Sequence, residues 1–208
     1  MRVSEDRYLR DLRRIHLAQR MIRHEVRTTT ICAWTGFNEE RIRNLAKSYE
    51  ATLVPASRHR GPPPKKVDVF LRHNLLRAEA ACLGGLARSF RILPADALPN
   101  AAQSLPGVAL GERLCDTFEV YRAVVPEARL TMEHFILLVL ALAEGREIEL
   151  DHCAHCSAVL IVETTSRERR ICFACRHSEG VRAGSSDEEG EDEPADHSPP
   201  VGVQQSLF

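Results

Sequence analysis

Residues 153–175 read CAHCSAVLIVETTSRERRICFAC, and the two C-x-x-C pairs in this stretch decide the most specific part of the fold. Fifteen residues separate the pairs, a spacing typical of four-cysteine zinc sites. Each pair can form a knuckle, a tight turn that directs both sulfurs toward one ion. The stretch therefore predicts one structural zinc ion per chain, bound by Cys153, Cys156, Cys172 and Cys175.

The residues between the pairs predict a β-hairpin. Val159–Glu163 has the composition of a strand, and we expect 169–171 to pair with it and bring the knuckles together. Four thiolates complete a tetrahedral shell, so the metal is expected to be structural and not catalytic. One alternative is a redox-active C-x-x-C pair, although that use needs a single motif on a βαβ frame.

Other cysteines and histidines give no further site. Three histidines lie near the pairs and can in principle replace one cysteine, although we interpret them as exposed or neighbouring residues: His152, His155 and His177. Cys32, Cys82 and Cys115 lie apart in predicted helices, where a free cysteine usually acts as a small buried hydrophobic residue.

Composition indicates a soluble protein with one core and one small module. Of the 208 residues, 44% are hydrophobic and 27% charged. The N-terminal residues lack the apolar region of a signal peptide, and the longest apolar run, 135–143, is far shorter than the roughly 20 residues that span a bilayer. Seven cysteines without a secretory signal favour a reducing compartment, so we expect a cytoplasmic protein without membrane contact.

Upstream of the cysteines, apolar residues recur at helical spacing and predict a mainly α-helical body over residues 1–147, followed by the zinc ribbon over 148–178. The Gly84–Gly85 pair indicates close packing or a kink in one of these helices. The helical segments are expected at about 4–26, 28–51 with an internal turn, 67–90, 110–125 and 131–143.

The segment 28–51 has the pattern of a helix-turn-helix. Residues 34–37 are expected to form the turn, and Asn38 is expected to cap the second helix, with Glu39 and Glu40 in its first turn. Such a second helix can enter the major groove of DNA, but a structural helical hairpin with a solvated face fits equally well. The predicted DNA contacts are Arg41, Arg43, Lys47, Arg58, Arg60, Lys65 and Lys66.

Charge is separated along the chain. Residues 1–92 hold 19 Lys and Arg against 9 Asp and Glu, whereas residues 93–208 hold 9 against 20. The basic half includes 57–66, SRHRGPPPKK, whose three consecutive prolines predict an extended loop suited to phosphates. Residues 179–208, rich in acidic residues, Gly, Ser and Pro, predict a disordered acidic tail.

Several of these features, in their order along about residues 10–177, resemble the flagellar transcriptional activator FlhC family. TGFNEERIRNLAKSY over 35–49 resembles the family's segment before its proline-rich loop, RGPPPKK over 60–66 resembles that loop, and the cysteine pairs stand in the expected place. The resemblance implies that the family's four zinc ligands correspond to the four cysteines named above.

The resemblance also implies a function. FlhC proteins form a hetero-oligomer with FlhD, bind double-stranded DNA upstream of flagellar operons and recruit RNA polymerase. We therefore expect a transcriptional activator of motility genes that acts with an FlhD-like partner. The alternative is an interaction protein that titrates this partner without binding DNA. We expect no enzyme and no small-molecule substrate, because the sequence offers no readable catalytic constellation or phosphate-binding glycine loop.

Overall fold

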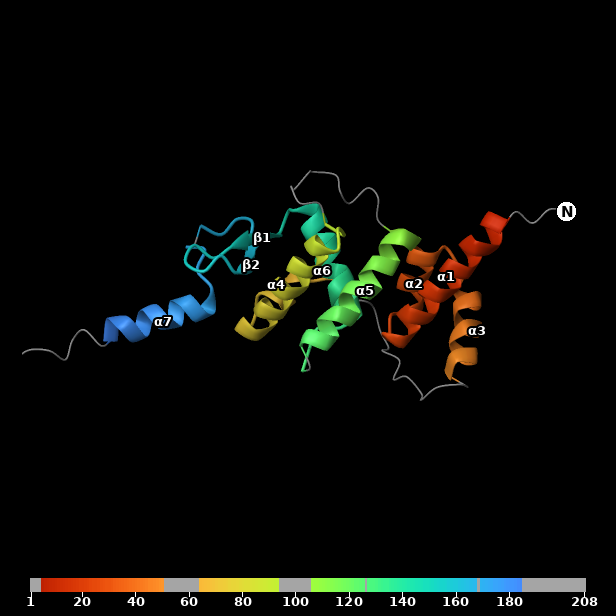
Figure 1. Cartoon of the computed structure of the whole chain (residues 1–208), viewed down its shortest axis with the longest axis horizontal. Coiled ribbons are helices and arrows are strands. Elements are labelled where there is room, and N and C mark those ends of the chain that lie inside the picture. The colour runs from red at the N-terminus through yellow and green to blue at the C-terminus, as the bar shows by residue number, and fades with distance from the viewer. Residues whose placement is uncertain (1–4, 51–63, 94–105, 126, 168, 185–208) are drawn as a thin grey trace, which may run out of the picture.

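The structure, a computed structural model, describes residues 5–50, 64–93, 106–125, 127–167 and 169–184. These residues are mainly helical, as predicted, with one two-stranded sheet (Figure 1). The elements in chain order are α1 (Glu5–Arg23), α2 (Thr28–Thr35), α3 (Glu39–Glu50), the 3₁₀ turn η1 (Val67–Phe70), α4 (Asn74–Ser89), α5 (Val108–Val124), α6 (Met132–Glu144), β1 (Ile148–His152), β2 (Val159–Glu163) and α7 (Phe173–Gly184).

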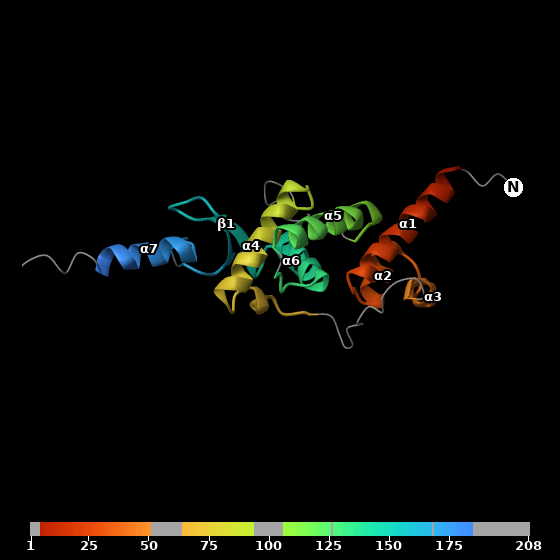
Figure 2. The ribbon, with the colours of Figure 1, turned by 60° about the horizontal axis from the view of Figure 1, so that its bottom comes forward.

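These elements follow one another along an elongated molecule. The helices α1–α3 lie at one end, α4–α6 lie in the middle, and the sheet and α7 lie at the other end (Figure 1). Figure 2 shows the same order from a second direction, with α7 pointing away from the helical body. No helix among the described residues is long and apolar enough to cross a membrane.

The helix α1 packs on α2, α3 and α5 through an apolar stripe. Leu17 and Met21, one turn apart, are fully buried on this face. The helix ends at Arg23, before the predicted end at 26, because Glu25 takes a left-handed φ of 58° and the Val26 N–H donates to the Met21 carbonyl at 3.0 Å. This turn redirects the chain into α2.

The predicted turn between α2 and α3 is present in the structure. Gly36 has a φ of 71°, a conformation that favours glycine, and its N–H donates to the Cys32 carbonyl at 2.9 Å. Asn38 Oδ1 accepts the Arg41 N–H at 2.9 Å, so the predicted cap of α3 is confirmed. The buried Ile42 anchors α3 to the body and leaves its opposite face in solvent.

The helix predicted over 67–90 is wrong at its start, because two elements replace it. η1 buries Val67 and Phe70, and the N–H groups of Leu71 and Arg72 both donate to the Asp68 carbonyl. His73 is then extended, with φ −131° and ψ 141°, before α4 begins at Asn74. No glycine or proline marks this break in the sequence, so residue pattern alone does not show it.

A buried carboxylate fastens the middle of the body together. Glu79 of α4 is 4% exposed, and its Oε2 accepts the Tyr121 hydroxyl of α5 at 2.5 Å. The same oxygen accepts the N–H groups of Arg129 at 2.9 Å and Leu130 at 3.1 Å, just before α6. Burial, together with the hydrogen bond to Glu79, raises the pKa of Tyr121 well above its usual range.

The hairpin differs from the predicted one. β2 occupies the predicted Val159–Glu163, but its partner is β1, in an antiparallel register from Ile148↔Glu163 to His152↔Val159. Residues 169–171 form no strand, although the Arg170 carbonyl accepts the Ala154 N–H at 2.8 Å. The predicted ribbon boundary at 148 coincides with the start of β1, whereas its predicted end at 178 falls inside α7.

The acidic tail was predicted to begin at 179, but residues 179–184 belong to α7. The remainder of that segment, 185–208, lies outside the described residues.

The sheet packs on the helical body and completes its core. Ile148 and Ile161 are at most 1% exposed and belong to the main hydrophobic cluster. The side chain of Leu150 lies over Gly84 of α4, where an added Cβ would stand 2.6 Å from Leu150 Cδ2. The predicted close packing at the glycine pair is therefore present, and it joins α4 to the ribbon.

The glycine pair offers a matched test of this packing. Gly84→Ala places a methyl group in the space of Leu150 and is expected to lower the free energy of unfolding by about 1–3 kcal/mol. Gly85→Ala meets Val159 only at 3.6 Å, an ordinary contact, and is expected to raise it by up to about 1 kcal/mol through helix propensity. Urea denaturation measures both, and equal effects at the two positions would contradict the close approach.

Candidate metal centre

Two turns at the end of the molecule bring the four predicted cysteines together. Cys153 follows β1 directly, and Cys156 lies in the hairpin loop. The loop is closed by the Cys153 N–H, which donates to the Ala158 carbonyl at 2.8 Å, and Ser157 takes a left-handed φ of 58° to complete the turn. Cys172 precedes α7, and Cys175 lies in its first turn.

The four sulfurs form one compact cluster within 4.8 Å of one another. The sulfurs of Cys156 and Cys172, from opposite knuckles, are 3.6 Å apart. A tetrahedral zinc ion with bonds of about 2.3 Å requires sulfurs roughly 3.8 Å apart, so the cluster fits such an ion. Bound there, a metal would link the hairpin to α7 and fix the fold of the ribbon.

The backbone around the sulfurs is arranged to stabilise thiolates. The Cys172 N–H donates to the Cys153 sulfur at 3.3 Å, and the Cys175 N–H points at the Cys172 sulfur at 3.4 Å. Backbone hydrogen bonds from Cys172 and Cys156 lower the pKa of Cys153 to about 6. Hydrogen bonds to the sulfurs of Cys172 and Cys156 raise the pKa of Cys175 to about 12.

This contrast has a chemical meaning. Cys153 ionises at a lower pH than Cys175, whose thiol is kept protonated mainly by its hydrogen bonds to the sulfurs of Cys172 and Cys156. Four thiolates need a cation to offset their repulsion, so metal binding at this site is coupled to proton release. The four donors leave no coordination position for a substrate.

No histidine joins the sulfur cluster among the described residues. His152, His155 and His177 are all exposed.

The remaining cysteines are separate from the centre: Cys115 is fully buried in the core, and burial raises the pKa of its thiol to about 12. Cys32 and Cys82 are half-buried, and burial raises their pKa values as well.

The predicted DNA contacts fall in three places. Arg41, Arg43 and Lys47 are exposed on α3, and Lys65 and Lys66 are exposed just before η1. Arg58 and Arg60 lie outside the described residues. Arg43 forms an ion pair with Glu39, whereas the Arg41 guanidinium stacks over the Phe37 ring at 3.9 Å.

The outer face of α3 also carries a polar groove that the sequence did not reveal. It is a shallow, open hollow of about 360 Å³ beside Arg41, with amide and hydroxyl groups around it. The lining residues are Asn38, Glu40, Arg41, Asn44, Leu45 and Ser48. The regular spacing of polar residues on this face is the signal from which it could have been found.

Part of the positive charge of the N-terminal half is used within the fold. Arg20 of α1 pairs with Asp116 and Glu119 of α5 at 2.7 and 2.9 Å, and Arg13 pairs with Glu112 on the same seam. These arginines hold α1 against α5. The excess of Lys and Arg in residues 1–92 therefore overstates the charge that is available to a polyanion.

Comparison with known proteins adds no relative: no protein-family model and no curated protein matches the chain. The resemblance to the FlhC family stays a prediction from the sequence.

Proposed function

We propose that this protein is a DNA-binding regulator of transcription whose ribbon is held by one structural zinc ion. The observation that carries the proposal is the helix, glycine turn and helix over 28–50, whose second helix exposes Arg41 and Lys47 on a polar outer face. Arg41 and Lys47 stand one to two turns apart on the outer face of α3, where a recognition helix presents side chains to base edges and phosphates.

The local structure around α3 supports this use. The Gly36 turn and the Asn38 cap fix where α3 begins, and Ile42 and Ala46 bury its inner face. Arg41, Asn44 and Ser48 on the outer face offer donors and acceptors for base edges or phosphates. Glu39 and Glu40 at the start of the helix oppose phosphate binding, so the phosphate contacts are expected at Arg41 and Lys47.

Zinc is the metal that best fits the donor set. Four thiolates in a tetrahedral arrangement select zinc or iron, and a closed four-cysteine site without a redox partner is typical of structural zinc. Bound zinc would hold the ribbon against α4, where Leu150 and Val159 meet the glycine pair. Its role in the proposal is therefore to maintain the shape of the protein.

The finer parts of the proposal rest on the sequence resemblance alone. They are an FlhD-like partner, flagellar promoters as the DNA, recruitment of RNA polymerase and a cytoplasmic location. Residues 35–49, residues 60–66 and the two cysteine pairs carry this resemblance, and the first of these segments coincides with the turn and most of α3.

Co-expression with a candidate FlhD, followed by mass measurement and footprinting on a flagellar promoter, tests the proposal. With the purified complex, replacing Arg41 and Lys47 together by alanine is expected to weaken duplex binding about 10-fold or more. The slope of log affinity against log salt should also fall by about 1–2, because each lost phosphate contact contributes about 0.9.

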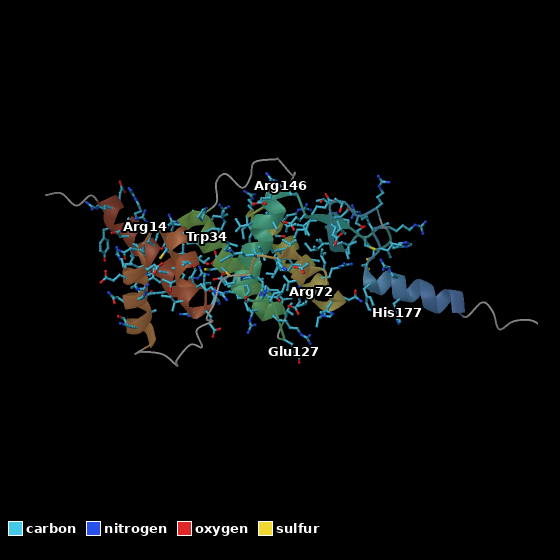
Figure 3. All side chains as sticks on the ribbon, turned by 180° about the vertical axis from the view of Figure 1, so that it is seen from behind. Arg14, Trp34, Arg72, Glu127, Arg146 and His177 are labelled. Atoms are coloured by element: carbon cyan, nitrogen blue, oxygen red, sulfur yellow. The ribbon has the colours of Figure 1, made fainter. Side chains whose placement is uncertain are left out.

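Arg72→Ala is the matched control. Arg72 is also exposed, but it lies away from α3 and pairs with Asp68 at 2.7 Å, so its loss should leave DNA affinity unchanged (Figure 3). A complex that forms with the partner but protects no DNA would favour the titrating interaction protein instead. Equal losses in the Arg41/Lys47 and Arg72 variants would remove α3 as the contact.

A further inference from the structure

Two aromatic rings stand at the start of α7, beside the metal centre. The Phe173 side chain is 62% exposed, and His177, one helical turn later, is exposed as well. Their ring centroids are 6.0 Å apart and their planes differ by only 12°, so the rings share one orientation. His177 lies at the opposite end of the molecule from Arg14 of α1 (Figure 3).

The fold does not explain why a phenylalanine occupies this position. Phe173 lies between Cys172 and Cys175, so a metal in the cluster would fix its backbone, while α7 leads away from the helical body (Figure 2). The Phe173 ring therefore lies outside the hydrophobic core. An exposed ring on such a fixed backbone has the properties of a binding group.

Exposed arginines lie close to the two rings in the sequence. Arg167 and Arg169 precede α7, Arg176 lies on it, and all three side chains are exposed. Among the side chains that the structure describes, which do not include those of Glu168 and Glu179, no carboxylate pairs with them, whereas the neighbouring Arg170 is held by Glu149 at 3.1 Å and Asp151 at 2.9 Å. A divalent ion with four thiolates would carry two negative charges, and the three exposed arginines carry three positive charges.

We infer that Phe173 and His177 form a stacking platform for the bases of single-stranded nucleic acid, with Arg167, Arg169 and Arg176 binding its phosphates. Aromatic rings beside a positively charged surface are the arrangement by which proteins hold single strands without sequence preference. Successive bases of a strand lie parallel to one another, and the shared orientation of the two rings matches them. Duplex bases are already stacked on their neighbours and cannot reach the rings.

This inference goes beyond the proposed function, because it uses neither α3 nor an FlhD-like partner. The cations favour a nucleic acid over an apolar protein surface, since a hydrophobic partner would leave three arginines without counter-charges. DNA and RNA share the chemistry that the platform recognises, so both are included in the experiment.

The experiment measures binding of the full-length, metal-loaded protein to labelled oligothymidine and oligouridine of about 15 nucleotides, and to a duplex of the same length. Phe173→Ala is expected to weaken binding to both single strands about 5- to 150-fold, as loss of one stacked base does, with little change for the duplex. Arg176→Ala should lower the salt slope for single strands by about 0.7. Tyr8→Ala, which removes an exposed aromatic ring 65% accessible on α1, should change nothing.

Two further variants separate stacking from misfolding and from the proposed function. Phe173→Trp should retain single-strand affinity, and its fluorescence should be quenched by the strand, since the sole native tryptophan, Trp34, is only 4% exposed. The Arg41/Lys47 variant should bind single strands normally. Unchanged binding by Phe173→Ala at full metal content would overturn the inference, as would equal losses for single strands and duplex or the absence of single-strand binding by the wild type.

Discussion

Cys153→Ser is expected to deprive the protein of its metal and loosen the whole ribbon. Structural zinc sites contribute apparent binding energies of about 10–16 kcal/mol, and loss of one of four ligands removes about 3 kcal/mol or more, over a hundredfold in affinity. Cys153 is 2% exposed and accepts the Cys172 N–H at 3.3 Å, so a serine there, whose side chain is shorter, also weakens the contact between the knuckles. Metal analysis and limited proteolysis of the hairpin measure the effect.

Loss of the metal is expected to destabilise the helical body as well. Ile148 and Ile161 of the hairpin belong to the main core, so a loosened ribbon is expected to lower the melting temperature of the helices. Replacing Cys32 and Cys82 by alanine is the matched control, because both thiols are half-buried and outside the sulfur cluster. A Cys153→Ser protein that keeps a full metal equivalent and wild-type protease resistance would show that the cluster is not the binding site.

Glu79→Ala is expected to lower the free energy of unfolding by about 3–5 kcal/mol. The substitution leaves the Tyr121 hydroxyl and two backbone N–H groups, those of Arg129 and Leu130, without their shared acceptor. Each donor left unsatisfied in the interior costs about 1–3 kcal/mol, although water entering the new cavity recovers part of the loss. Urea denaturation by circular dichroism measures the change.

Tyr121→Phe separates the carboxylate from the ring. It removes one donor and keeps the packing of the aromatic ring against Phe118, so its cost should be only about 1–2 kcal/mol. The order of effects, with Glu79→Ala well above Tyr121→Phe, follows from the number of donors on one oxygen. If the free energy of unfolding of Glu79→Ala lies within about 1 kcal/mol of the wild-type value, the buried hydrogen bonds do not hold α4 to α5.

Local signals in the sequence were sufficient where the cause is local. The two C-x-x-C pairs predict the cluster because the knuckle geometry is set by residues three apart. Gly36 and Asn38 predict the turn before α3 because each acts on its own neighbouring backbone. Helical spacing likewise predicts the existence of α4, α5 and α6, though not the start of α4.

Contacts between residues that lie far apart in the sequence could not be predicted from local signals. Both β1 and residues 169–171 can pair with β2, and the choice is made by Ile148, whose burial in the core requires the helices to be in place. Glu79 gave no signal either, because a glutamate in an amphipathic helix is normally exposed and its partners lie 42 or more residues away. The ion pairs of Arg13 and Arg20 with α5 are likewise invisible in the sequence, where both arginines add to the net positive charge of residues 1–92.

The candidate functional residues also divide into those that local sequence signals predict and those that only the structure shows. The positions of Arg41 and Lys47 on the exposed face of α3 follow from helical spacing around the buried Ile42. The ring pair on α7 was not predicted, since the sequence indicated only a cysteine knuckle at 172–175 and a tail soon after it. Its recognition required the exposure of Phe173 and the orientation of both rings.

We propose that the four cysteines hold one structural zinc ion, and the metal content of the purified, full-length wild-type protein is the decisive measurement. Inductively coupled plasma mass spectrometry, with sulfur as the internal measure of protein, gives the metal and the ratio together. We expect one zinc per chain, and removal of that zinc by a chelator should unfold the ribbon. A folded protein that contains neither zinc nor another metal, with its hairpin intact, would contradict it.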